Sequence, residues 1–424
     1  MTNGFSQLAI ASFVAIAASS PAFGQSLANR IASASDRSVQ FTYAARPGVC
    51  GDGRTYISTG SGNFYGSFYS DAADKCQPGP VRVVIDLADR NVVAVRTFVG
   101  ASSPGTDPGV ADLGNVNPAE AAEYLLGVAT RADGRVGRDA IFAALLGDKV
   151  DATSRLLEIG RDQNRPLETR RAALSGLVRS EAPQLDRIGA ALVQIATNEN
   201  DVQGVRTQAL SVLSRLDHGA GIQPLVQLAS GNINSWIGRE SMRVLSSSGD
   251  PRARQFLRSS AQRTDLPDEL LAVAIRGLGR NYVTGQDANL LRSLYPRLTG
   301  ERSRDAVLAS LSELGGNDNV QWLIGVVRDE KLTPEQRRRA LEYLSRAGAT
   351  TPSLLALYDP TPDPQLRSAL IGIYARLADK AATDKLVWIA RNETNLQLKR
   401  RAISALSRNS DPTIRQALQD IVER

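Results

Sequence analysis

Arg170-Arg-Ala-Ala-Leu-Ser-Gly-Leu177 returns as Arg206-Thr-Gln-Ala-Leu-Ser-Val-Leu213 and again as Lys399-Arg-Arg-Ala-Ile-Ser-Ala-Leu406. Each copy has a small residue, an aliphatic residue, two free positions and a second aliphatic residue, and often a basic residue three places before the small one. Successive copies lie 29 to 36 residues apart, centred on Ala140, Ala173, Ala209, Ser241, Ala274, Val307, Ala340, Ala369 and Ala402. A period this regular predicts an array of stacked units rather than a single globular core.

Each unit is expected to contain two helices. The motif places its apolar groups on one helical face, and a second apolar helix follows. The first leucines of these second helices are Leu156, Leu192, Leu225, Leu257, Leu291, Leu323, Leu355, Leu386 and Leu418. Helix starts are marked by a capping residue before proline, at Asn117-Pro118, Asp250-Pro251, Thr333-Pro334, Thr351-Pro352, Asp363-Pro364 and Asp411-Pro412.

Two further patterns are typical of a known family. Asp201-x-x-x-Val205-Arg206-x-x-Ala209-Leu210 and the turn Gly249-Asp-Pro-Arg-Ala253 resemble HEAT repeats, and more narrowly the short bacterial HEAT-like repeats shared with phycobilin lyases. The resemblance implies a mainly α fold, an α/α solenoid of about nine hairpins over residues 117–424, whose second helices line the concave surface. It also implies an Arg of one unit near an Asp of the next. Arg170, Arg206, Arg304 and Arg337 fit that place, whereas Gly137, Gly238, Leu271 and Leu366 do not.

The N-terminus resembles a secretory signal. Residues 8–18 are apolar or small apart from Ser12, and a small-x-small site ends at Gly24. The run is too short to span a bilayer, although no Lys or Arg precedes it. We therefore expect residues 1–24 to be a signal peptide and the mature protein to be exported, periplasmic or extracellular, without spanning a membrane.

A small β domain is expected over residues 25–100. Val39-Gln-Phe41-Thr-Tyr43 alternates as a strand does, and Ala88-Asp-Arg-Asn91 separates two strand-like runs as a hairpin turn would. Residues 101–116 are rich in Ser, Pro and Gly, which predicts a linker and a domain boundary. We expect the helical array to unfold separately from this β domain.

The two cysteines of the chain, Cys50 and Cys76, both lie in the β domain. In an exported protein such a pair favours a disulfide, with a metal pair or a reactive thiol as alternatives. The aromatic strip from Gly60 to Tyr69 has two interpretations as well. It presents a binding face, or Phe64 and Phe68 fill the core of the small domain.

No pattern of a catalytic, metal or cofactor site stands out. The single histidine, His218, lies in an expected turn without a nucleophile elbow, and no glycine-rich phosphate loop joins a strand to a helix. The net charge of +6 is spread over arginines interleaved with Asp and Glu, which favours a solvated surface over a nucleic-acid stripe. We expect no enzymatic activity, no cofactor and no nucleic-acid partner.

The sequence favours a non-catalytic scaffold for a protein or peptide partner. The alternative is a HEAT-fold enzyme or ligand binder, lyase-like or nucleic-acid-binding. Trp388 and Arg391 lie two and five places after Leu386, at positions expected to face outward, and are the candidate partner contacts. A rotated helix in which Trp388 fills a gap in the core is the competing interpretation.

Overall fold

The computed structural model describes eleven segments of the chain. They divide between two compact units, Met1–Ser180 and Glu181–Arg424. The described residues are 25–34, 37–54, 56–59, 64–65, 76–100, 109–132, 134–180, 182–280, 284–377, 379–407 and 418–419. The expected signal peptide, most of the aromatic strip and the Asp411-Pro412 start lie outside them.

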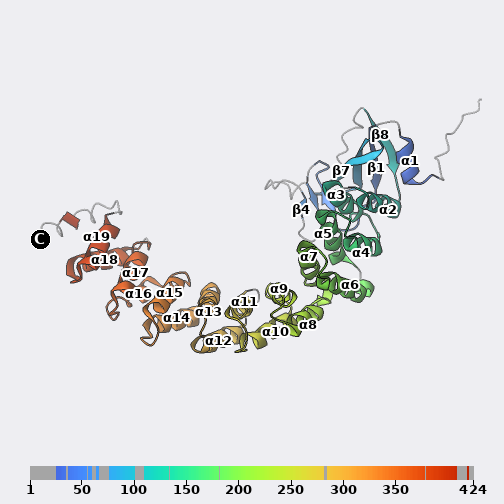
Figure 1. Cartoon of the computed structure of the whole chain (residues 1–424). Helices are drawn as coiled ribbons and strands as arrows, with labels where there is room; N and C mark the ends of the chain where they lie inside the picture. The colour runs from blue at the N-terminus through green and yellow to red at the C-terminus, as the bar shows by residue number, and fades with distance from the viewer. Residues whose placement is uncertain are drawn as a thin grey trace, which may run out of the picture. The chain divides into compact units, whose positions relative to one another are not determined.

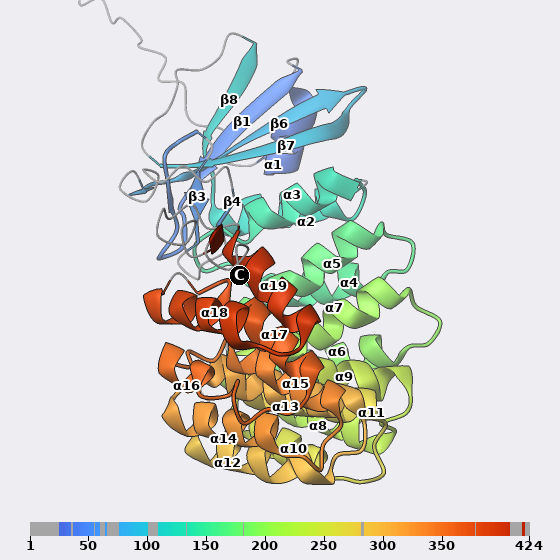
Figure 2. The ribbon, with the colours of Figure 1, turned by 90° about the vertical axis from the view of Figure 1, so that its left-hand side faces the viewer.

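The first unit contains a four-stranded sheet in the order β7-β6-β1-β8 (Figures 1 and 2). β1 (Ser38–Tyr43) pairs antiparallel with β6 (Val81–Ala88), which forms a hairpin with β7 (Asn91–Val99). Asp89 and Arg90 have φ of 49° and 65°. Two positive φ values in a two-residue turn match the right-handed twist of the strands, so the expected hairpin is confirmed.

A second, smaller sheet has the order β4-β3-β2-β5 and carries the disulfide. Its strands are β2 (Cys50–Gly51), β3 (Ile57–Ser58), β4 (Phe64–Tyr65) and β5 (Gln77–Pro78). Cys50 is bonded to Cys76, with their Cα atoms 5.1 Å apart. The metal-pair and free-thiol alternatives do not hold in this structure. The side chains of the aromatic strip are not described, so neither interpretation of it is tested.

The boundary between the β domain and the array differs from the expectation. Val110–Asn115, inside the expected linker, forms β8 and pairs parallel with β1. Asp112 and Gly114 suggest a loop by composition, but the Asp112 carboxylate accepts the N–H of Gly114 within the strand. The edge of β1 supplies hydrogen-bond partners that composition does not reveal.

The sheet is also joined to the first helices. The Tyr43 hydroxyl donates to the carbonyl of Ala143 at 2.6 Å, and Ala45 forms an antiparallel bridge with Gly147. At the other side, the N–H of Leu27, which opens α1 (Leu27–Ser33), donates to Glu120 of α2. The β domain and these helices therefore share one packed unit.

The rest of the chain is helical and forms the α/α solenoid. In the first unit the helices are α2 (Pro118–Ala129), α3 (Gly134–Ala144), α4 (Thr153–Arg161) and α5 (Leu167–Gly176). In the second unit they are α6 (Leu185–Thr197), α7 (Gln203–Leu213), α8 (Ile222–Gly231), α9 (Trp236–Leu245), α10 (Pro251–Ala261), α11 (Asp268–Gly279), α12 (Gly285–Leu294), α13 (Glu301–Leu314), α14 (Asn317–Arg328), α15 (Pro334–Leu344), α16 (Thr351–Leu355), α17 (Pro364–Tyr374), α18 (Lys380–Asn392) and α19 (Leu396–Leu406). No helix in the described segments is both long and apolar enough to cross a membrane.

Seven even-numbered helices pair with the odd-numbered helix that follows them, whereas α12 contacts α11 and α13 equally and the short α16 packs mainly on α18. α6 packs chiefly against α7, α8 against α9, and α18 against α19. Figure 2 shows α14, α16 and α18 stacked beside α13, α15 and α17. The repeated motif lies in the odd-numbered helices, so it belongs to the second helix of each hairpin and not to the first. This corrects the expected grouping, because motif spacing locates helices but does not show which connection is the tight turn.

The core follows the repeated motif closely. Its first position is fully buried in eight of the nine copies, at Ala140, Ala173, Ala209, Ser241, Ala274, Val307, Ala340 and Ala402. The leucines that the sequence predicted in the even-numbered helices from α4 to α18, which we call marker leucines, are buried from Leu156 to Leu323 and at Leu386. In the five-residue helix α16, Leu354 takes the core position and Leu355 is only half-buried. Small side chains at the helix contact allow the backbones to approach closely.

Four of the predicted helix starts are confirmed as side-chain caps. Asn117, Asp250, Thr333 and Asp363 each accept a backbone N–H of the first turn, and proline follows each of them. Thr350, one residue earlier than expected, is the N-cap residue of α16. A side-chain acceptor satisfies a donor that the helix cannot satisfy itself.

Three hairpins are closed by what we call an arginine clasp, in which an arginine Nε donates to the carbonyl ten residues earlier. The pairs are Arg170 to Gly160 at 3.1 Å, Arg206 to Ala196 at 3.0 Å and Arg337 to Val327 at 2.7 Å. Each acceptor lies in the last turn of the hairpin's first helix. The positive charge therefore meets the negative end of the helix dipole and satisfies a carbonyl that the helix leaves open.

The turns under these clasps share a second feature. Asp162, Asn198 and Asp329 open the three turns, and each side chain accepts the N–H two residues later, at 3.0, 3.2 and 3.0 Å. Such a turn reverses the chain within a few residues. In the α8–α9 hairpin the clasp position is Gly238, where a Cβ would lie 2.1 Å from the carbonyl oxygen of Asn232. There the turn packs directly on the helix, which requires glycine.

Candidate functional site

Trp388 lies at the surface of α18 and is 47% exposed. Leu386, Ile389 and Ala390 of the same helix are buried. The interpretation in which Trp388 fills a gap in the core is therefore wrong for this structure. An exposed tryptophan is unusual, because large apolar side chains are normally buried and tryptophan is enriched at interface hot spots.

Lys385 holds the Trp388 ring in place. Its Nζ lies 4.2 Å from the centre of the Trp388 ring and 5.5 Å from the centre of the Tyr358 ring. The same ammonium forms an ion pair with Asp359 at 2.7 Å, and only 16% of the lysine side chain is exposed. A cation over an aromatic face contributes roughly 0.5–1 kcal/mol at an accessible site. The contact with Lys385 favours one orientation of the ring, which remains 47% exposed.

Tyr358 connects this surface to the core. Its hydroxyl donates to Glu393, at the end of α18, and its ring lies 5.2 Å from the Arg367 guanidinium. Burial, followed by the neighbouring Glu393 carboxylate, raises the pKa of Tyr358 well above its usual value. Burial opposes the charge of Glu393, but N–H donors of the following turn, the Tyr358 hydroxyl and Arg367 together hold its pKa below the usual value. Tyr358 therefore stays protonated and Glu393 ionised at neutral pH, which preserves the hydrogen bond between them.

Arg391, the second candidate contact, is exposed on the same helix. It lies three residues after Trp388, a spacing that places two side chains on adjacent parts of one helical face. The outward orientation of both residues agrees with the sequence-based expectation. Lys385 and Tyr358 were not predicted, because their contacts join α18 to the end of α16 and no local pattern records them.

The helix row that carries Trp388 differs from the expectation. In the second unit, α9, α11 and α13 form the inner row of the curve in Figure 1 and α8, α10 and α12 form the outer row. α18 belongs to the even-numbered, leucine-marked series, which was expected to line the concave side. The difference follows from the hairpin grouping, since the leucine-marked helices come first in each pair.

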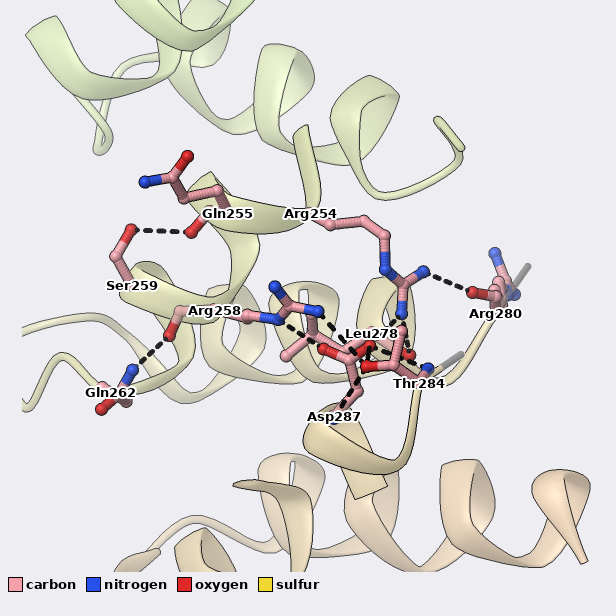
Figure 3. A network of polar contacts seen from close by, with 9 residues as sticks. All are labelled: Arg254, Gln255, Arg258, Ser259, Gln262, Leu278, Arg280, Thr284 and Asp287. Atoms are coloured by element: carbon pink, nitrogen blue, oxygen red, sulfur yellow. Dashed lines mark hydrogen bonds and ion pairs between the residues drawn. The ribbon is translucent and has the colours of Figure 1, made fainter. Parts of the chain in front are cut away.

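A buried network of charged side chains lies between α10 and α12 (Figure 3). Asp287 is 0% exposed and accepts from Arg254 at 2.7 Å and from Arg258 at 2.6 Å. Arg254 also donates to the carbonyls of Leu278 and Arg280. Burial opposes the charge of Asp287, yet Arg258, Arg254 and Thr284 hold its pKa well below the usual value. Both carboxylate oxygens are engaged, so this network joins α10, α11 and α12.

The described residues include His218, which the sequence offered as the one histidine for a catalytic group. His218 is exposed at a positive φ of 55°, and its carbonyl accepts from Arg252. Within those residues no group of three or more His, Cys, Asp or Glu side chains is placed to hold a metal ion.

Comparisons with known proteins concern the fold alone. Human deoxyhypusine hydroxylase in complex with glycerol is 16% identical, with a TM-score of 0.28, over 57% of this chain and 97% of that one. A chain of the Pds5–Scc1 complex is 12% identical, with a TM-score of 0.34, over 72% of this chain and 57% of that one. A structure of tubulin recruitment by TOG domain arrays is 11% identical, with a TM-score of 0.26, over 72% and 91%. No family model matches the chain, and no curated protein sequence matches it.

Proposed function

We propose that this protein is an exported, non-catalytic scaffold that binds a partner protein through the Trp388 surface of α18. The observation that carries the proposal is the exposed indole of Trp388 in contact with the Lys385 ammonium, which also lies near the Tyr358 ring. A fixed aromatic ring loses little side-chain entropy on binding, and a neighbouring arginine is the other residue type enriched at hot spots. Arg391 supplies that neighbour.

Trp388→Ala tests the proposal. The partner would be captured from the native envelope with the full chain, and its affinity for purified wild type and variant would then be measured by calorimetry. We expect a loss of about 2 kcal/mol or more, roughly thirtyfold in Kd, because the anchor is removed. The melting temperature should barely change, since the side chain is half exposed.

Val202→Ala is the matched control. Val202 is 53% exposed in the same unit but lies far along the chain from α18. The Val202→Ala substitution should leave the affinity for the partner unchanged. Equal affinity of wild type and Trp388→Ala for the partner would remove the proposed binding surface.

Export has its own test. The disulfide between Cys50 and Cys76 supports an oxidising compartment, and the apolar run before Gly24 supports cleavage there. Intact mass of the protein from its native host, with and without reductant, should show a chain that begins near Gln25 and gains the mass of two hydrogens on reduction. An uncut chain with two free thiols would contradict export.

A further inference from the structure

The positive charge of the chain is concentrated in its last described helices. Residues 364–407 contain eight basic and three acidic side chains, an excess of five against a net charge of +6 for the whole chain. They are Arg367, Arg376, Lys380, Lys385, Arg391, Lys399, Arg400 and Arg401 against Asp379, Asp384 and Glu393.

Three of these basic side chains form neither an ion pair nor a hydrogen bond in the described segments. Arg367 pairs with Glu393, Lys380 with Asp384 and Lys385 with Asp359. Of the other five, Lys399 donates to the carbonyl of Arg391, and Arg391 has an interaction of its own. The remaining three are Arg376, just after α17, and the adjacent pair Arg400 and Arg401 on α19. No carboxylate of the described residues compensates their charge, which is available to an anionic ligand.

Two of the three guanidinium groups converge on one point. A Cβ placed on Gly372 of α17 would lie 3.4 Å from Nη2 of Arg401 and 3.9 Å from Nη1 of Arg376. Glycine therefore leaves a space that both arginines border. Two like charges so close repel each other. A carboxylate bound between them would attract both guanidinium groups and so offset this repulsion.

A cleft opens beside Arg401, between the first turns of α17 and α19. It has a volume of about 330 Å³ and is lined by Pro364, Gln365, Ser368, Asn395, Gln397, Leu398 and Arg401. This lining has amides and a hydroxyl, which can bond a peptide backbone, but neither a carboxylate nor an aromatic ring. Single-stranded nucleic acids are usually held by stacking on aromatic rings, so the lining favours a peptide.

The helix N-termini do not supply the binding charge. Asp363 already accepts the N–H groups of Gln365 and Leu366, and Asn395 accepts those of Gln397 and Leu398. We propose that the α17–α19 cleft binds an acidic peptide segment, with Arg401 and Arg376 gripping an Asp or Glu carboxylate. This second surface goes beyond the Trp388 contact and does not depend on it.

The test uses a fluorescein-labelled peptide of alternating Glu and Gly, titrated with the full chain near physiological ionic strength. Arg401→Glu and Arg376→Glu should each weaken binding by about tenfold or more, because a charge-assisted bond is replaced by repulsion. Arg328→Glu and Arg297→Glu are matched controls. Both residues are exposed arginines of the same unit that also lack an acidic partner in the described structure, and the change in net charge is identical. The controls should stay within about twofold of the wild type.

Three results would overturn the proposal. Equal loss in all four variants would mean attraction to net charge rather than a site. Tighter binding of an oligonucleotide of matched charge, lost in Arg401→Glu, would assign the cleft to nucleic acid. Self-association of the chain that Arg401→Glu abolishes would make a second copy the occupant. Circular dichroism of each variant shows that a loss of binding is not a loss of fold, and Trp388→Ala should leave this peptide affinity unchanged.

Discussion

Asp287 illustrates how one carboxylate fixes the position of three helices. Its two oxygens bond arginines of α10, while Arg254 reaches the carbonyls at the end of α11. The sequence did not reveal this network, because Arg254, Arg258 and Asp287 fit no repeated position. Trp388 was found from its place two residues after a marker leucine, whereas its support by Lys385 is a tertiary contact without a local signal.

Replacing Asp287 with asparagine should destabilise the second unit by about 3–5 kcal/mol, because Arg254 keeps a buried charge without its partner. Urea unfolding at neutral pH, followed by far-UV circular dichroism, measures the change. Asp265→Asn is the control, since its ion pair with Arg263 is exposed and screened by solvent, so its midpoint should stay close to that of the wild type. Equal midpoints for the two variants would refute the role assigned to the network.

The same substitution should change the response to acid. The pKa of Asp287 is lowered in the folded chain, so its contribution to stability is present above the unfolded pKa of about 4 and is lost as the pH falls toward the folded value. The difference in urea midpoint between wild type and Asp287→Asn should therefore shrink from about pH 5 to about pH 3. A difference that stays constant over this range would argue against an ionised Asp287 as the cause.

At the scale of elements, the repeat predicted which segments are helices but not how they pair. The buried Ala-Leu-x-x-Leu faces and the caps at Asn117, Asp250, Thr333 and Asp363 were read from local pattern, which side-chain periodicity and capping chemistry determine. Hairpin grouping depends on which connection is short, and strand β8 depends on the free edge of β1. Both are properties of the assembled fold.

Truncation at two positions tests the hairpin grouping. A chain ending at Thr394 keeps α18 but loses α19, so the apolar face around Leu386 loses the helix against which it chiefly packs. That protein should aggregate, because each unit buries its apolar surface only against its neighbours. A chain ending at Ala378 loses the whole hairpin and should stay more soluble. Size-exclusion chromatography measures both, and the opposite order would contradict the pairing of α18 with α19.

At the scale of the molecule, the chain divides within the helical array and not after the β domain. The first unit runs to Ser180, and the bonds of Tyr43 to Ala143 and of Ala45 to Gly147 join sheet to helix. The array was expected to unfold separately from the β domain, and these contacts argue against that for α2 and α3. The Ser, Pro and Gly content of residues 101–116 indicated a domain boundary, but the sheet and the first helices pack together.

Removing the disulfide should therefore loosen more than the small sheet. Cys50→Ala with Cys76→Ala frees a loop whose closure contributes roughly 3 kcal/mol on the chain-entropy model. Hydrogen exchange should accelerate together in β1 and in residues 118–144, while residues 301–344 of the second unit serve as the internal control. Unchanged protection in 118–144 beside faster exchange in β1 would show that the sheet opens alone.

The arginine clasps restrict the number of residues in the turns that they span. Because the guanidinium must meet a carbonyl ten residues earlier, one added or lost residue between Val327 and Arg337, or in the two matching turns, would pull donor and acceptor apart. In the described residues, no arginine clasp spans a connection that joins one hairpin to the next, so the length of these connections is less restricted. Insertions such as a fluorescent tag or a grafted loop therefore belong in those connections, for example beside Gly315 and Gly316, where φ is already positive and a Cβ would meet little.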